Sequence, residues 1–349
     1  MEVCIDGHIL GCGFPTFVVA EISASHGGKL EKALELVRAA KRSGADAIKL
    51  QTYTADTITF KSDKSDFLIP NTSPWSEYKT MWDLYDVAKT PWEWHADIFA
   101  EAKKNGLVAF SSPFDNTAVD FLESHNVPAY KIASPEITDI PLLERVAATG
   151  KPIIISSGLA TLEDLDLAID TLKRGGAHEI IMLKCNSAYP SPLSDSNLKT
   201  ISDMSKRFGV LSGLSDHTLG VADAIVSIGL GACVIEKHIK LNNDESSVDA
   251  FFSASEKTFT EMVKSIREVE LSLGKVNYQI SESAKKNLIG RKSLYAVKSI
   301  AKGALITSDN IKSIRPAYGI HPKFFADLIG RRVLKDVSSG DRLSWDMFE

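Results

Sequence analysis

The chain has 349 residues, of which 44% are hydrophobic and 24% are charged, and its formal net charge is −5. This composition is that of a globular protein and excludes disordered, collagen-like and coiled-coil chains. The negative balance gives no bulk attraction to nucleic acid or to an anionic membrane surface, so we expect neither as a partner. The apolar runs are near strand length, far short of the ~20 residues that a membrane helix needs.

The first residues and the cysteines bear on the location of the protein. The first six residues include two acids and no base, which is unlike a signal peptide and favours a cytoplasmic location. The four cysteines, Cys4, Cys12, Cys185 and Cys233, show no C-x-x-C spacing, so we expect neither a zinc ribbon nor a disulfide scaffold. We interpret them as small core residues.

Short apolar runs rich in β-branched residues alternate with longer amphipathic segments, which predicts βα units and a parallel sheet. Eight strands are expected, at 16–21, 46–51, 107–111, 129–132, 152–156, 179–184, 210–214 and 232–237. Helices are expected at 30–43, 91–105, 116–124, 142–149, 162–174, 197–208, 220–230 and 259–273. Eight such units predict a (β/α)8 TIM barrel. A doubly wound sheet is the alternative, but it usually has fewer strands and a glycine-rich first turn.

Segments at the two ends of the chain complete the domain plan. Residues 3–10, with Asp6-Gly7 at the centre, predict a hairpin that plugs the bottom of the barrel. We expect the barrel domain at 1–275, a polar linker at 276–290 and a second domain at 291–349, with strand-like runs at 293–297, 304–306, 333–334 and 342–343. About 60 residues is small for an independent core, so we expect this domain to lean on a barrel.

Three lysines stand at the ends of alternate predicted strands, where barrel enzymes build their active sites. They are Lys49, Lys131 and Lys184, and serines lie between them in the predicted mouth. Together they predict an anion site for a phosphate and a carboxylate. The alternative is that each is a solvated lysine at the start of a loop.

Two histidines follow the last two predicted strands. His217 and His238 would be neighbours in a closed barrel and predict a pair of ligands for Mn²⁺ or Mg²⁺. Glu21 ends the first strand, beside the eighth, and would add a carboxylate or act as a base. The alternative for each histidine is a hydrogen-bonded structural residue.

The segment 52–90 is far longer than an ordinary βα loop and carries several aromatic residues. A long aromatic loop above a barrel mouth is typical of a lid or a wall of the substrate site. An extra packed helix is the alternative.

Several motifs, in this order, resemble the sialic acid synthase family, whose members condense phosphoenolpyruvate with an amino-sugar aldehyde. They are Ala20-Glu21-Ile22, Lys49-Leu50-Gln51, Lys131-Ile132-Ala133-Ser134, Ser215-Asp216-His217-Thr218-Leu219-Gly220 and Val234-Ile235-Glu236-Lys237-His238. The resemblance covers almost the whole chain. Residues 291–349 resemble the antifreeze-like (SAF) domain that ends these enzymes, with Arg315-Pro316 at the expected place.

Two further segments are similar to the pseudaminic acid synthase branch of this family. They are Thr90-Pro91-Trp92-Glu93-Trp94-His95 and Ser247-Val248-Asp249-Ala250-Phe251-Phe252-Ser253. The sugar implied for this branch is 2,4-diacetamido-2,4,6-trideoxy-L-altrose. Sialic acid synthases commonly have Asn-His in the first loop, whereas this chain has Ser25-His26.

The resemblance implies roles for individual residues. The phosphate and carboxylate of phosphoenolpyruvate would be held by Lys49, Lys131, Ser134, Ser156, Lys184, Asn186 and Ser215. His217 and His238 would bind the metal, and Glu21 would be the catalytic acid or base. Gln51, Tyr189 and Asp249 would contact the sugar.

The resemblance also implies a homodimer in which each SAF domain covers the partner's barrel and Arg315 reaches the acetamido group of the sugar. A surface arginine in a turn is the alternative for this residue. Two other functions stay open. One is a legionaminic or N-acetylneuraminic acid synthase with the same chemistry, and the other is a non-catalytic barrel whose SAF domain binds carbohydrate.

Overall fold

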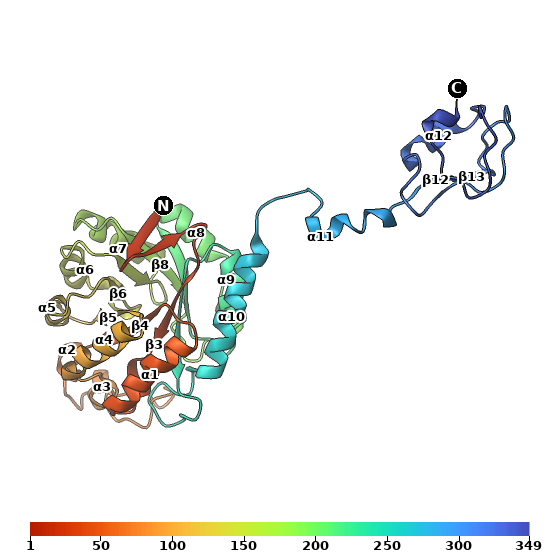
Figure 1. Cartoon of the computed structure of the whole chain (residues 1–349). Helices are drawn as coiled ribbons and strands as arrows, with labels where there is room; N and C mark the ends of the chain where they lie inside the picture. Colours follow the sequence, from red (N-terminus) through yellow and green to blue (C-terminus); the bar gives the residue numbers. More distant parts are fainter. Residues whose placement is uncertain (349) are drawn as a thin grey trace. The chain divides into compact units, whose positions relative to one another are not determined.

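The computed structural model describes residues 1–348, and the chain forms two compact units, Met1–Gly274 and Lys275–Glu349 (Figure 1). Across the described residues, every helix is too short or too polar to cross a lipid bilayer.

The first unit is a closed barrel of eight parallel strands. Strands β3 to β9 lie next to one another in the order in which they occur in the chain. The last strand, β10, pairs with both β3 and β9 and so closes the ring. The strands are β3 (Phe17–Glu21), β4 (Ala47–Thr52), β5 (Val108–Pro113), β6 (Tyr130–Ile132), β7 (Ile153–Ser156), β8 (Ile180–Cys185), β9 (Leu211–Asp216) and β10 (Val234–Lys240). The predicted barrel is therefore confirmed, and the doubly wound alternative is wrong.

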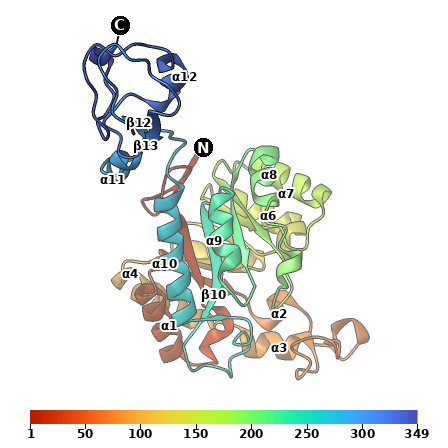
Figure 2. The same ribbon diagram turned by 90° about the vertical axis from the view of Figure 1, so that its right-hand side faces the viewer.

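Helices cover the outside of the barrel because each has one apolar face. In α1 (Leu30–Arg42) the buried residues Ala33, Leu36, Val37 and Ala40 recur at helical spacing. The other covering helices are α4 (His95–Lys104), α5 (Asn116–Ser124), α6 (Ile140–Ala147), α7 (Leu162–Arg174), α8 (Thr200–Phe208), α9 (Ala222–Gly229) and α10 (Glu256–Leu273). Figure 2 shows α9 and α10 side by side on the outer face.

Two connections depart from a plain βα repeat. The segment after β4 contains α2 (Ala55–Ile58), a 3₁₀ turn (Ser65–Phe67) and α3 (Met81–Ala88), so it is partly helical. After β10, a loop leads to the short strand β11 (Ala254–Ser255), which pairs with the end of β10. Both connections follow strands at their carboxyl ends and therefore reach the mouth of the barrel.

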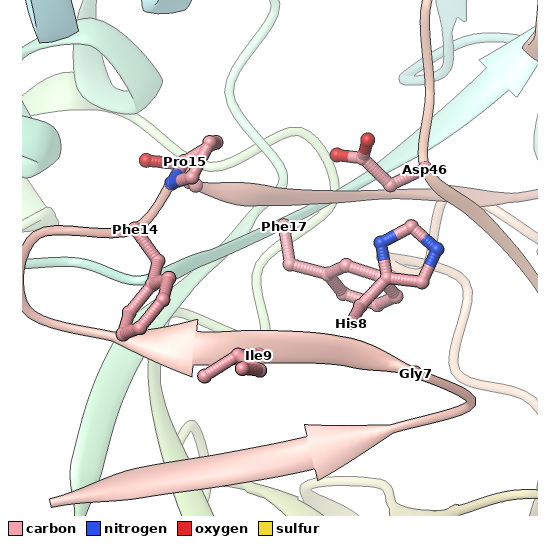
Figure 3. A pocket seen from close by; sticks show the side chains of 8 residues that line it. Gly7, His8, Ile9, Phe14, Pro15, Phe17 and Asp46 are labelled. Carbon is pink, nitrogen blue, oxygen red and sulfur yellow. The ribbon is translucent and has the colours of Figure 1, made fainter.

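The N-terminal hairpin closes the opposite end of the barrel. Strands β1 (Glu2–Ile5) and β2 (His8–Gly11) pair antiparallel, and Val3, Ile5 and Leu10 pack among residues inside the barrel. This confirms the predicted plug. A hollow of about 380 Å³ lies beside the hairpin, where the His8 and Phe17 rings meet edge to face near Asp46 (Figure 3). It lies at the end of the strands away from the predicted site.

A buried ion pair lies on the outer face of β9 and β10. The Lys237 ammonium is 2.7 Å from Asp216 Oδ2 and donates to the Thr218 carbonyl at 2.5 Å. Asp216 Oδ1 in turn accepts from the Thr218 amide at 2.9 Å. Every charge in this group is matched, which is the condition for burying an ion pair without a large penalty. The pair holds the turn after β9 against β10.

The second unit has a small core of its own. Strands β12 (Ser293–Ala296) and β13 (Ile311–Ile314) pair antiparallel, and apolar residues such as Leu294, Ile311 and Val333 are buried together. The sequence did not indicate β13, and the runs expected at 304–306, 333–334 and 342–343 form isolated bridges instead. The unit also contains α11 (Glu282–Lys285), within the expected linker, and α12 (Phe325–Leu328).

The interpretation of the cysteines was correct for two of the four. Cys185 and Cys233 are buried in the barrel, whereas Cys4 and Cys12 are exposed. The exposed pair belongs to the hairpin region, where alternate residues of an outer strand face solvent.

Candidate active site

Four charged side chains meet inside the mouth of the barrel. Glu21 on β3 forms an ion pair with Lys49 on β4, and Lys49 Nζ lies 3.5 Å from Glu236 Oε1 on β10. Lys131 Nζ on β6 lies 4.0 Å from the same oxygen. All four side chains are at most 5% exposed. We call Glu21, Lys49, Lys131 and Glu236 the charged floor.

Burial and pairing act in opposite directions on the pKa values of the charged floor. Burial raises the pKa of Glu21, and Lys49 only partly offsets this effect. Burial would also raise the pKa of Glu236, but the nearby Lys131 and Lys49 lower it below its ordinary value. Burial lowers the pKa of Lys131 despite the attraction of Glu236. Glu21 is therefore the carboxyl of the floor that most easily carries a proton.

Hydroxyl groups surround the floor. Ser215 on β9 donates toward Glu236 Oε1 at 3.5 Å, and the buried Ser156 hydroxyl on β7 has no partner within the described protein. Ser134 Oγ accepts a hydrogen bond from the Gly158 amide at 3.0 Å. A Cβ on Gly158 would lie 2.3 Å from Ser187 Oγ, so glycine is needed where these loops approach each other. The mouth thus combines two ammonium groups with one hydroxyl that has no partner among the described residues and two that are hydrogen-bonded.

The two histidines lie together above this floor. The ring centroids of His217 and His238 are 5.5 Å apart. His217 Nδ1 lies 2.9 Å from the Asn186 carbonyl oxygen, so this nitrogen is the hydrogen-bond donor. Burial lowers the pKa of His217, but the nearby Cys185 and the Asn186 carbonyl outweigh burial and raise it. Burial and the neighbouring cations hold the pKa of His238 well below its usual range, so its imidazole is neutral.

These features fit a divalent cation. Neutral imidazoles are metal ligands, and the buried His238 Nδ1 has no hydrogen-bond partner in the described protein. Residues 1–348 contain no group of three or more His, Cys, Asp or Glu side chains arranged to hold a metal. Two protein ligands suit an ion that takes its remaining ligands from substrate or water, as Mg²⁺ does.

Other predicted residues border the histidines. The Tyr189 ring lies 4.5 Å from the His217 ring. Asp249 Oδ2 accepts from Ser23 Oγ at 3.1 Å and lies 3.7 Å from His238 Nδ1, and burial raises the pKa of Asp249 to about 6. Asn186 donates to Ser191 Oγ at 2.8 Å. Gln51 follows Lys49 by two residues on β4 and therefore shares its face.

One predicted residue of the barrel, Lys184, does not face the interior with this group. Lys184 alternates with Cys185 on β8, so it faces the outer layer while Cys185 faces inward, and Lys184 Nζ donates to the Cys185 carbonyl at 2.8 Å. The predicted convergence of three lysines is thus a convergence of Lys49 and Lys131. Arg315 is exposed in the second unit, directly after β13.

Sequence reasoning missed two residues of the mouth. Glu236 contacts both floor lysines, and Cys185 Sγ lies 3.8 Å from His217 Nδ1. Strand alternation would have found both, because Glu236 precedes His238 by two residues and Cys185 follows the buried Leu183 by two.

The long segment 52–90 also reaches the mouth, as expected for a wall of the substrate site. The Trp75 ring lies 5.5 Å from the Tyr189 ring and 6.5 Å from the Phe252 ring. The alternative of a packed helix also holds in part, because α2 and α3 lie in the same segment.

The comparisons with known proteins agree with this geometry. The NeuB family profile matches residues 36–278, and the SAF domain profile matches residues 291–349. The chain belongs to the NeuB family, which confirms the resemblance to sialic acid synthases, and it ends in a SAF domain.

Individual relatives share nearly the whole length of the chain. It is 44% identical to a pseudaminic acid synthase of Campylobacter jejuni, over 94% of this chain and 95% of the relative. It is 34% identical to an N,N'-diacetyllegionaminic acid synthase of Legionella pneumophila, over 97% of this chain and 96% of the relative. The crystal structure of the spore coat polysaccharide biosynthesis protein spsE of Bacillus subtilis matches with a TM-score of 0.68 at 29% identity, covering 100% of this chain and 99% of that one.

We predict that Glu136, which follows β6, makes the stability of the protein depend on pH. Burial raises the pKa of Glu136 to about 7. The protonated carboxyl therefore contributes its full share to the free energy of unfolding below the pKa of the unfolded chain, and this share is lost as the pH rises through 7. Glu136→Gln mimics the neutral form. Urea unfolding should therefore show the variant gaining about 1–3 kcal/mol on the wild type between pH 5 and pH 8.

Glu77→Gln, at an exposed position, is the control and should leave the pH dependence unchanged. The same difference between the Glu136 variant and the wild type at both pH values would mean that the carboxyl is already ionised at pH 5.

Proposed function

We propose that this chain is a pseudaminic acid synthase. It condenses phosphoenolpyruvate with 2,4-diacetamido-2,4,6-trideoxy-L-altrose and water, and it releases pseudaminic acid and phosphate by C–O cleavage. The observation that carries this proposal is the 44% identity to a pseudaminic acid synthase over 94% of the chain. The buried lysines and paired histidines at one mouth support it, because a non-catalytic relic has no need of them.

Phosphoenolpyruvate binds on the charged floor. Lys49 and Lys131 hold its phosphate and carboxylate, and Ser134, Ser156, Asn186 and Ser215 supply hydrogen bonds. Lys184 is left out of this set because it faces the outer layer. Without substrate, the floor has two ammonium groups and two carboxyl groups, so an entering anion needs additional positive charge or a proton on Glu21.

His217 and His238 hold Mn²⁺ or Mg²⁺, which would supply that charge and a Lewis acid for the sugar aldehyde. The His238 imidazole is neutral. The pKa of His217 is raised, so binding of the ion would displace a proton from this ring. Asn186 fixes the orientation of His217 through its carbonyl oxygen, 2.9 Å from Nδ1.

The remaining residues position the reactants and move protons. C3 of phosphoenolpyruvate attacks the aldehyde carbon, water adds to C2, and the tetrahedral product loses phosphate. Glu21, whose pKa is raised by burial, is suited to hold and transfer a proton during these steps. Gln51, Tyr189 and Asp249 contact the sugar.

The working unit is a homodimer in which Arg315 of one subunit completes the sugar site of the other. The exposed segment before β12 is long enough to carry the SAF domain to a partner. A planar guanidinium suits the acetamido group, because it can donate two parallel hydrogen bonds. The enzyme works in the cytoplasm, where phosphoenolpyruvate is made.

The function is tested by mixing the chain with phosphoenolpyruvate, the altrose derivative and Mn²⁺. Phosphate release should require all three, and mass spectrometry and NMR should identify pseudaminic acid. EDTA should stop the reaction, and His217→Ala should lower turnover by more than about 100-fold and weaken Mn²⁺ binding in calorimetry.

Preferential turnover of the precursor of legionaminic acid or of N-acetylneuraminic acid would assign the chain to that activity instead. Full activity of a well-folded His217→Ala protein would contradict the metal assignment.

The phosphoenolpyruvate site is tested with two lysine variants. Lys131→Ala removes one charge-assisted contact worth about 1.5–3 kcal/mol, so calorimetry should show an affinity about 10–150-fold lower. Lys184→Ala is the matched control, since its ammonium faces the outer layer, and it should leave the affinity nearly unchanged. Equal losses in both variants would contradict the proposed site.

Shared sites are tested by complementation between two inactive chains. His238→Ala disables the barrel, and Arg315→Ala disables the SAF domain. A heterodimer of the two has one intact composite site if the domains cross over, so it should regain about half the activity of the wild-type dimer. No recovery after proven subunit exchange would mean that each SAF domain covers its own barrel.

A further inference from the structure

Four aromatic side chains from three separate segments meet beside the histidines. Trp75 comes from the segment after β4, Tyr189 follows β8, and Phe251 and Phe252 lie in the loop after β10. The ring centroids of Phe252 are 5.0 Å from both Tyr189 and Phe251, and Trp75 lies 5.7 Å from Phe251. We call these four residues the aromatic wall.

The polar atoms of the aromatic wall are already engaged. Trp75 Nε1, its one hydrogen-bond donor, donates to the Val248 carbonyl at 3.2 Å. The Tyr189 hydroxyl lies beside the Ser187 side chain and interacts with it. Phe251 and Phe252 have no polar side-chain atoms. The wall therefore offers carbon, and few hydrogen bonds, to anything that lies against it.

The aromatic wall starts at the histidines and ends at the surface. Phe252 is buried with its ring 4.7 Å from His238, whereas Phe251 is 43% exposed. An extended six-carbon chain spans about 6 Å from its first to its last carbon. A sugar whose aldehyde lies at the histidines can thus place its last carbon against the wall.

We propose that the aromatic wall selects sugars that carry a methyl group, and not a hydroxymethyl group, at C6. This inference rests on the proposed function and extends it to one position of the substrate. A methyl group gains from leaving water for an aromatic surface. A hydroxyl at the same place loses its hydrogen bonds to water and finds no partner, because the wall's polar atoms are engaged.

The test compares 2,4-diacetamido-2,4,6-trideoxy-L-altrose with its 6-hydroxy analogue, using phosphate release to measure kcat/KM. An apolar pocket rejects an added hydroxyl only moderately, so the wild type should prefer the 6-deoxy sugar by about 10–100-fold. Phe251→Asn and Trp75→Gln introduce hydrogen-bonding groups and should reduce this ratio to below about 5-fold. Trp75→Phe keeps an apolar ring and should keep the preference.

Two controls make the outcome decisive. Phe60→Asn changes an exposed ring in the same segment as Trp75 and should leave the ratio unchanged. Calorimetry with phosphoenolpyruvate checks that each variant retains a folded floor. An unchanged ratio in Phe251→Asn and Trp75→Gln, or no preference in the wild type, would overturn the inference. A wild type that turns over neither sugar would instead overturn the proposed function.

Discussion

Burying two carboxyl groups and two ammonium groups at the mouth of the barrel is the constraint on which the rest of the site depends. Each of these charges is acceptable there only because another offsets it. Lys49 lies between Glu21 and Glu236, and Lys131 shares Glu236 with it. An anion cannot simply be added to such a balanced set. It needs a proton or a cation, and the imidazoles of His217 and His238 lie together above the floor, where we propose that a cation binds.

Because side chains alternate along each strand, the residues of the mouth and the residues that pack against the outer helices occupy opposite faces of the same strands. On β10, Glu236 and His238 face the barrel interior, while Lys237 between them faces the helices and pairs with Asp216. The outer ion pair fixes the turn that carries His217, so adjacent residues of one motif serve opposite faces. A shift of one residue in register would exchange these faces and destroy both.

The same alternation explains how far the sequence alone could lead. The eight strands and their order followed from apolar β-branched runs, and these strands bring Glu21, Lys49 and Lys131, which the sequence singled out, to one mouth. Strand β8 continues to Cys185, one residue beyond its predicted end, so the inward position belongs to Cys185 and not to Lys184. Glu236 was missed although it lies in the motif Val234–His238, because its contacts are with two lysines on β4 and β6 that are distant in the sequence. The contact between Trp75 and Phe252 joins distant segments, and no spacing in the sequence encodes it.

The site therefore has two parts with different mechanical support. The charged floor lies on barrel strands, whose hydrogen-bonded neighbours hold each side chain in place. The aromatic wall lies on loops, which vary in length and composition at little cost to the barrel. In the reaction that we propose, the anion binds on the barrel scaffold and the sugar lies against the loops, so the sugar site can change while the anion site stays constant. Substitutions in the loops can then alter the sugar without disturbing the balanced charges beneath it.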